Sequence, residues 1–227
     1  MNRPYIICHM VESIDGRIDC SMVEHISGDE YYTTLEALDC PASIEGRVTM
    51  EHYYALPGKF EELNRTVIGK ECFFRATERT DFHICPETKG TLLWESNIFE
   101  DGRPLLVITS EKTTCEYLDY LKEYGISYIV TGKEKIDLKH AMAILHDEFK
   151  VDRLAVLGGG VINGGFLEAG LIDEISLLLA PGIDGREGWR AMFDGIANQD
   201  KLPTKLKLTA LERLENDVVW LRYNVLG

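Results

Sequence analysis

The sequence predicts an α/β fold with three layers, in which helices cover both faces of a mostly parallel sheet and an antiparallel hairpin forms its C-terminal edge. Two observations carry this prediction. Short apolar runs alternate along the chain with segments of helical periodicity, which is the pattern of repeated strand–helix–strand units. The last two apolar runs are separated by a turn signal at residues 215–217, as in an antiparallel hairpin. The length of 227 residues fits one domain over residues 1–227.

The predicted strands are short apolar runs bounded by turn residues. They occupy residues 5–10, 42–48, 105–109, 128–130, 154–157, 174–180, 206–211 and 218–225. The first of them ends at the turn signal Ser13-Ile14-Asp15-Gly16. Residues 57–103 are irregular and rich in charges, aromatic residues and glycine, and no element is predicted there.

Capping signals set the boundaries of the predicted helices. Ser27 and Glu30 have the spacing of a capping box, with Ser27 at the N-cap, and residues 113–116 offer a second box. Asp137 is expected to cap a helix whose apolar residues recur at helical spacing. The predicted helices cover residues 27–38, 113–125, 137–149 and 161–169, and another begins after Gly46.

The composition excludes several kinds of partner. A net charge of −14 repels nucleic acid and anionic membranes, and no basic patch offsets it. The six cysteines lack C-x-x-C spacing, so we expect no metal site and no disulfides, with thiols kept reduced in the cytoplasm. No stretch approaches the roughly 20 apolar residues of a membrane span, and the N-terminal run is too short for a signal peptide. The expected partner is therefore a small molecule.

Gly158-Gly159-Gly160 lies between a predicted strand and a predicted helix. Without Cβ atoms, this turn would let the phosphates and the nicotinamide of a cofactor approach the backbone, at a helix N-terminus that attracts anions. It does not match the G-x-G-x-x-G fingerprint, and no lysine follows as in a phosphate-binding NTPase loop. Tight packing of strand against helix is the alternative explanation, and the spacing alone leaves both open.

A second strand-to-helix junction carries Gly46-Arg47-Val48-Thr49, which places a cation and a hydroxyl where a phosphate could bind. The alternative is a surface arginine beside a helix N-cap. Two such junctions on neighbouring parallel strands would face the same edge of the sheet, where ligands gather. The two junctions together therefore indicate a nucleotide site better than either does alone.

Several short motifs follow one another in an order that a known family shares. They are Pro4-Tyr5, residues 13–16, residues 46–49, Arg103-Pro104 before the run at 105–110, Leu157 to Val161, and residues 170–185. This series resembles the reductase domain of RibD-type riboflavin biosynthesis enzymes, within the wider dihydrofolate reductase superfamily. The resemblance extends over nearly the whole chain, and the block from residue 158 to residue 181 is its most specific part.

The resemblance implies a dihydrofolate-reductase-like fold, a homodimer and NADPH-dependent reduction, similar to 5-amino-6-(5-phosphoribosylamino)uracil reductase. It implies that Arg47 and Thr49 hold cofactor phosphates and that Ser110 meets the adenosine 2′-phosphate, which favours NADPH over NADH. The cofactor-binding residues that it implies are Gly46, Arg47, Thr49, Ser110, Gly158, Gly159, Gly160, Val161 and Ile162.

Two positions depart from the family pattern. Reductases acting on the phosphoribosylaminopyrimidine carry a lysine where His9 stands and a glutamate where Leu157 stands, and both are associated with the ribosyl phosphate of the substrate. The family's D-x-P-x-L segment after the G-x-x-T motif is also absent. We therefore predict poor turnover of that substrate by this chain. A folate or pterin reductase, or a nucleotide-binding module without catalysis, stays open as an alternative.

Three side chains are candidate proton donors, and each has a structural alternative. Glu30 opens a helix, similar to the position of the acid in folate reductases, but it can also satisfy backbone amides as a cap. Asp15 is the second candidate, and the alternative is that its side chain merely shapes the turn. His9 can be a donor or a hydrogen-bonded core histidine. The substrate is expected to lie beside Ser13, Ser27 and Leu157.

Overall fold

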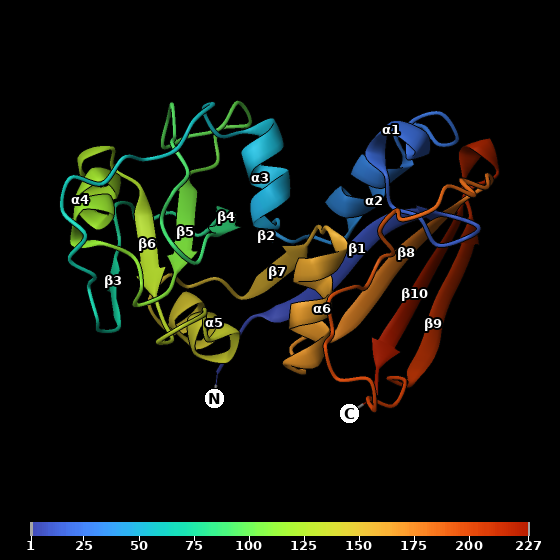
Figure 1. Ribbon diagram of the computed structural model, residues 1–227. Helices are drawn as coiled ribbons and strands as arrows, with labels where there is room; N and C mark the ends of the chain where they lie inside the picture. The colour runs from blue at the N-terminus through green and yellow to red at the C-terminus, as the bar shows by residue number, and fades with distance from the viewer. Residues whose placement is uncertain (1, 227) are drawn as a thin grey trace. The chain divides into compact units, whose positions relative to one another are not determined.

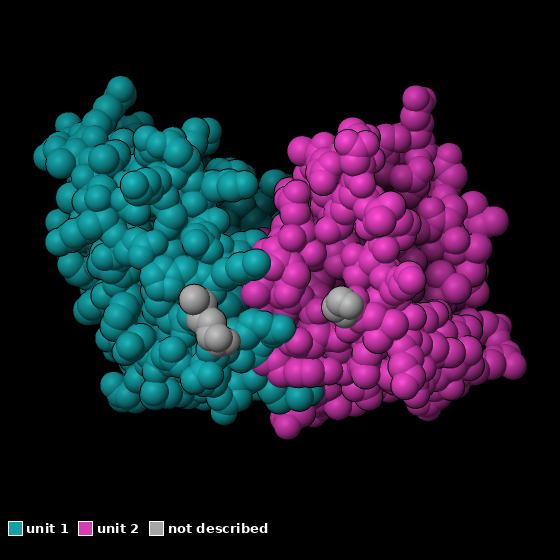
Figure 2. All heavy atoms as spheres, turned by 90° about the horizontal axis from the view of Figure 1, so that it is seen from below, with its two compact units in different colours: residues 1–4, 41–154 teal, residues 5–40, 155–227 magenta. Residues whose placement is uncertain are grey.

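The computed structural model describes residues 2–226 (Figure 1). The chain forms two compact units (Figure 2). Unit 1 comprises residues 1–4 and 41–154, and unit 2 comprises residues 5–40 and 155–227. The short strand β7, Arg153–Val156, carries the chain from the first unit into the second. The expectation of one domain over residues 1–227 stays a prediction.

The helices and strands of unit 1 come from the middle of the chain. They are β2 (Ala42–Ile44), α3 (Arg47–Tyr53), β3 (Cys72–Phe74), β4 (His83–Pro86), β5 (Leu105–Thr109), α4 (Cys115–Glu123), β6 (Ser127–Val130) and α5 (Leu138–Asp147). Their sheet has the order β3-β6-β5-β4-β2. The pairs β2/β4, β4/β5 and β5/β6 are parallel, and β3 pairs antiparallel with β6 at the edge. β5 is buried at every residue, as expected of a central parallel strand.

Unit 2 contains the two ends of the chain. Its elements are β1 (Tyr5–Ser13), α1 (Cys20–Val23), α2 (Glu30–Ala37), α6 (Gly160–Glu168), β8 (Glu174–Ala180), β9 (Leu206–Arg213), the 3₁₀ turn η1 (Glu215–Asp217) and β10 (Val219–Val225). The strand order is β1-β8-β10-β9, with β1 parallel to β8 and the remaining pairs antiparallel. This confirms the predicted α/β class, with a mostly parallel sheet and an antiparallel C-terminal hairpin.

Three local predictions need correction. The Ser27 hydroxyl donates to the Val23 carbonyl, so Ser27 is not an N-cap, and α2 begins only at Glu30. The second capping box is displaced by one residue, because Thr114 accepts the Tyr117 amide as the true cap of α4. β3 and β4 lie inside the region 57–103, where no element was predicted. Their few residues are too short a run for hydrophobic periodicity to indicate a strand.

Other boundaries agree with the sequence. Asp137 caps α5 by accepting the His140 amide, and Gly125 ends the α4 segment with φ of +67°. None of the helices in the described part of the chain has the length and apolar character that a membrane crossing requires. The described cysteines Cys8, Cys40, Cys72, Cys85 and Cys115 are free thiols.

Candidate cofactor and substrate site

The three glycines between β7 and α6 have three different structural roles. Gly158 has φ of +92°, a conformation that side chains rarely adopt. A Cβ on Gly160 would lie 2.2 Å from the Ala191 carbonyl oxygen, so the backbone packing excludes one. A Cβ on Gly159 would meet only Ile18 Cδ1, at 3.9 Å, and the φ of Gly159 is an ordinary −78°. Neither the space for a Cβ nor the φ of residue 159 therefore requires a glycine there, whereas the close approach of a ligand would.

A buried acceptor lies beside this turn. Asn163 is fully buried in the first turns of α6, and its Nδ2 donates to the Met192 carbonyl at 2.8 Å. Its Oδ1 has no hydrogen-bond partner, a condition shared only with Arg17 Nε among the buried side-chain atoms described. A ligand amide would satisfy this oxygen. Val161 is 57% exposed and Ile162 half-buried, so this side of the helix start is open. These features fit a nicotinamide dinucleotide.

The segment from residue 182 to residue 194, called the strap below, connects the β1 turn to the glycine turn. The Asp194 amide donates to the Gly160 carbonyl, and the Ile18 amide donates to the Arg190 carbonyl. Arg186 forms ion pairs with Asp184 and Asp19. The strap thereby holds the residues around Gly159 without filling the space next to it.

Asp15 is one of the anchors of this strap. Its carboxylate accepts hydrogen bonds from the Ser13 hydroxyl at 2.7 Å and from the amides of Asp184 and Gly185 at 2.9 Å each. These bonds hold the pKa of Asp15 well below its usual range. An ionised carboxylate whose oxygens are already engaged is a poor proton donor. The contacts therefore favour the structural alternative for Asp15, in which it shapes its turn.

His9 is fully buried and lies in a chain of hydrogen bonds. Nε2 is 3.0 Å from the Tyr31 carbonyl, Nδ1 is 2.9 Å from Ser176 Oγ, and Trp220 Nε1 donates to the same Oγ at 2.8 Å. Because a carbonyl only accepts, Nε2 carries the proton and the Ser176 hydroxyl donates to Nδ1. Burial lowers the pKa of His9 to about 4. A neutral ring with both nitrogens engaged fits a core histidine rather than a proton donor.

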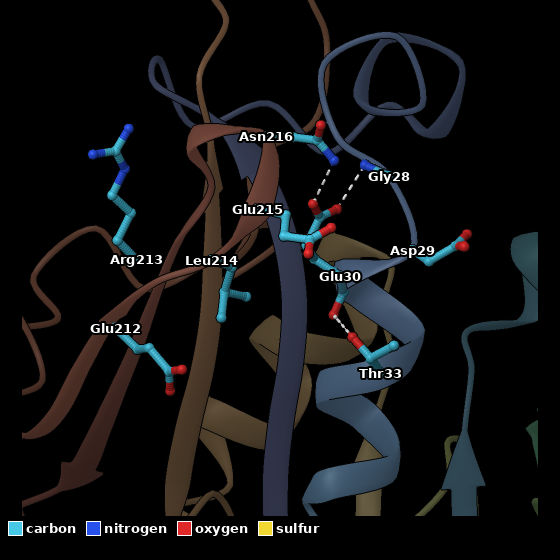
Figure 3. A pocket seen from close by; sticks show the side chains of 9 residues that line it. All are labelled: Gly28, Asp29, Glu30, Thr33, Glu212, Arg213, Leu214, Glu215 and Asn216. Atoms are coloured by element: carbon cyan, nitrogen blue, oxygen red, sulfur yellow. Dashed lines mark hydrogen bonds between the residues drawn. The ribbon is translucent and has the colours of Figure 1, made fainter.

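Glu30 lines an open pocket of about 830 Å³ between the start of α2 and the tip of the C-terminal hairpin (Figure 3). Its carboxylate accepts from the Gly28 amide at 2.6 Å and from Asn216 Nδ2 at 2.7 Å. Burial acts to raise the pKa of Glu30, but these hydrogen bonds outweigh it and the pKa is lowered. The carboxylate therefore satisfies backbone and side-chain donors, as the capping alternative expected.

In unit 1, Arg47 lies at the junction of β2 and α3, and its guanidinium already forms ion pairs with two carboxylates. It pairs with Glu51 at 2.7 Å and with the buried Glu87 at 3.3 Å. A phosphate here would have to compete with two carboxylates. Gly46 is the N-cap of α3 and supplies no side-chain cap to its first amides, and Thr49 is half-buried. This junction therefore offers backbone donors more readily than a free cation.

The role of Ser110 at the adenosine 2′-phosphate stays a prediction. The residue is fully buried, and its hydroxyl donates to the Thr88 carbonyl at 2.8 Å. Of the two lysines near Ser110, Lys112 was predicted either to assist with charge or to be solvated, and Lys89 was not singled out. Lys89 follows β4 and Lys112 follows β5, and these parallel neighbours end at the same edge of the unit 1 sheet. Lys89 is exposed and makes no ion pair with any described residue, whereas Lys112 pairs with Glu134.

Ser13 and Leu157, which were also predicted to contact the substrate, differ in how far they are exposed. Ser13 is buried, with its hydroxyl donating to Asp15 and accepting from the Arg17 amide. Leu157 is half-buried immediately before the glycine turn, which leaves it able to contact a ligand. Glu12, which was not singled out from the sequence, is an acid within the mostly apolar strand β1.

A mostly parallel α/β architecture with a glycine turn open to a ligand defines a nucleotide-cofactor-binding class of protein. Within that class, the chain belongs to the RibD C-terminal domain family, whose model matches residues 4–220 and so includes both units. This confirms the resemblance that the motifs indicated.

Two curated relatives and one solved structure illustrate the similarity. The chain is 26% identical to a 2,5-diamino-6-ribosylamino-4(3H)-pyrimidinone 5′-phosphate reductase of Methanothermobacter thermautotrophicus, over 99% of this chain and 100% of the relative. It is 25% identical to the protein of the same name in Aquifex aeolicus, over 86% and 84%. A pyrimidine reductase-like protein of Corynebacterium diphtheriae shares the fold, with a TM-score of 0.72, 20% identity and coverage of 99% and 92%.

Proposed function

We propose that this protein is an NADPH-dependent reductase that transfers a hydride to a small heterocyclic, imine-like substrate of the ribosylaminopyrimidine type. The observation that carries the proposal is the glycine at position 159, which has no structural requirement of its own and adjoins an unpartnered buried acceptor on Asn163. Membership of the RibD C-terminal domain family and the names of the curated relatives support the reductase activity. The free thiols are compatible with a cytoplasmic enzyme.

The residues of unit 2 would bind and orient the cofactor, and the cofactor itself would carry out the reduction. When bound, the reduced nicotinamide supplies the hydride. Gly159 gives room for a close approach, Gly160 ties the turn to the strap, and Asn163 Oδ1 offers an acceptor to a ligand amide. The half-buried Leu157 would contact the substrate or the nicotinamide through apolar surface.

A screen of NADPH oxidation tests the activity directly. The substrates are the ribosylaminopyrimidinone phosphate that names the curated relatives, dihydrofolate and an oxidised pterin, with absorbance at 340 nm as the readout. A folate or pterin reductase remains the second candidate, because His9 and Leu157 provide neither the cation nor the acceptor expected for a ribosyl phosphate. Oxidation of NADPH with none of these substrates, by protein that also fails to bind NADPH, would contradict the proposed function.

We expect NADPH to bind at least tenfold more tightly than NADH, measured by calorimetry at fixed salt. The 2′-phosphate of NADPH adds negative charge and acceptor oxygens, and charge-assisted hydrogen bonds to such a group are stronger than those to the neutral hydroxyl of NADH. Equal affinity of the unmodified protein for the two cofactors would contradict the preference.

We propose a homodimer that pairs the exposed face of the C-terminal hairpin. In β9, Leu206, Leu208 and Leu211 are directly opposite Val225, Tyr223 and Leu221 of β10, so they share one face of the sheet. The three leucines are 40–64% exposed, and β9 is exposed along its whole length. An apolar patch on an uncovered strand is typical of a self-association surface.

The double variant Leu208→Asp/Leu211→Asp is therefore expected to convert the dimer to a monomer, measured by sedimentation equilibrium at micromolar concentration. Lys207→Glu, on the opposite face of the same strand, is the control and should leave the dimer intact. A monomeric unmodified protein at this concentration would rule out the dimer.

A further inference from the structure

The structure leaves the proposed reductase without a proton donor among the three residues that the sequence offered. His9 is neutral and fully bonded, and the carboxylates of Asp15 and Glu30 are each held by donors. We propose that Glu12 is the catalytic acid, which protonates the heteroatom of the substrate double bond whose carbon accepts the hydride. This inference rests on the proposed reductase function and assigns one residue to it.

The position of Glu12 on β1 supports this role. Glu12 lies at the carboxyl end of the strand, in the parallel pair with β8, where it is opposite Leu179. Met10, two residues earlier, is on the same face of the sheet. Its Sδ lies 2.8 Å from where a Cβ of Gly158 would be, so this face of β1 runs directly under the glycine turn. Glu12 is therefore the next residue after Met10 on the face of β1 that meets the glycine turn, nearer to the carboxyl end of the strand.

Glu12 is also available, unlike the other acids. The residue is half-buried, and its carboxylate makes no hydrogen bond or ion pair with any residue in the described part of the chain. Burial raises the pKa of its carboxyl, because the charged form loses hydration that no partner replaces. A carboxyl whose pKa is raised by burial and which remains within reach of a ligand meets two requirements for a general acid.

The charged groups on the elements around Glu12 form hydrogen bonds or ion pairs with other residues. In the turn after β1, Asp15 accepts from the strap and Arg17 donates to the Trp189 carbonyl at 2.5 Å. On the strap, Arg186 pairs with Asp184 and Asp19. β8 presents Leu177 and Leu179 on this face, and neither has a charge. No neighbouring cation in the described residues therefore holds Glu12 in its ionised form.

Reduction of the substrate double bond takes up one hydride and one proton. The hydride adds to the carbon of the C=N or C=O bond, a new C–H bond forms and the π electrons move to the heteroatom. That atom takes the proton of the Glu12 carboxylic acid, which becomes a carboxylate and is reprotonated from solvent. The sum is consumption of one reduced cofactor and one proton per substrate reduced. Because the acid form is required, the rate should fall as pH rises through the pKa of Glu12.

Glu12→Gln tests the assignment with the substrate that the protein reduces fastest. We expect kcat to fall at least a hundredfold, in line with the contribution of general acids, while the Kd for NADPH stays within twofold. The alkaline decline of kcat should be absent from the residual activity of the variant. Glu12→Asp should recover part of the rate. Glu168→Gln, an exposed acid on α6, is the control and should behave as the unmodified protein.

A second measurement does not depend on turnover. In protein labelled with ¹³C at the glutamate side-chain carboxyl, the resonance missing from Glu12→Gln should titrate above the ordinary value of about 4.3. A kcat of Glu12→Gln within threefold of the unmodified protein, an unchanged alkaline decline, or a resonance titrating at the ordinary value would each overturn the assignment. Failure of the unmodified protein to bind NADPH would instead show that the proposed function itself is wrong, and the assignment with it.

Discussion

Gly159→Val is expected to abolish NADPH binding, by a factor of a hundred or more in Kd, while the protein remains folded. A Cβ at this position has only Ile18 within 4 Å, at 3.9 Å, and the backbone φ is allowed for any residue. A valine is therefore tolerated by the free protein, and its branched side chain would project into the space that the cofactor phosphates need. Circular dichroism and a fluorescence titration with NADPH, run on the same preparation, measure the two effects separately.

Gly160→Val is the matched comparison, since it differs by a single position. There the Cβ would lie 2.2 Å from the Ala191 carbonyl oxygen and 3.2 Å from Asp194 Cβ, so the variant must displace the strap. We expect loss of both fold stability and binding at 160, and loss of binding alone at 159. Unchanged NADPH affinity in Gly159→Val would show that the triple glycine serves only packing.

His9→Lys is expected to destabilise the protein by about 3 kcal/mol or more, with or without Leu157→Glu. The sequence alone led to a different expectation, in which the two substitutions together raise turnover of the phosphoribosylaminopyrimidine. That expectation required position 9 to face the substrate. A lysine there would place an ammonium in a fully buried site and break the hydrogen bonds to Ser176 and Tyr31. Urea denaturation measures the change in the free energy of unfolding.

Leu157→Glu alone is the control for this experiment. Leu157 is half-buried at the glycine turn, so a glutamate can turn its carboxylate to solvent, and we expect a change in stability below about 1 kcal/mol. Turnover of the phosphoribosylaminopyrimidine by the unmodified protein, which the sequence alone predicts to be poor, is measured in the same series. A turnover near ten per second, the median for enzymes, would show that His9 and Leu157 do not limit this substrate. A stable His9→Lys protein would contradict the account of the buried network.

The order of elements was predictable because it depends on local chemistry. Alternating apolar runs, the Asp137 cap and Gly125 are effects of neighbouring residues, and β8 was placed at residues 174–180 without error. The segment 57–103 shows the limit of this approach. β4 has only four residues and owes its place to parallel pairing with β2 and β5, which are about forty residues before it and about twenty after it.

The residue pattern alone was sufficient for the α/β class, the family and the glycine turn, since these follow from periodicity and from motifs read in order. The tertiary structure decided what each side chain does there. The polar groups of Ser110, Arg47, His9, Asp15 and Glu30 each have a partner from a segment far away in the sequence, and their predicted roles at the site stay predictions. Among the described residues, none forms a hydrogen bond or ion pair with the Glu12 carboxylate. Hydrogen-bond capacity is finite, and its allocation depends on contacts between residues far apart in the chain.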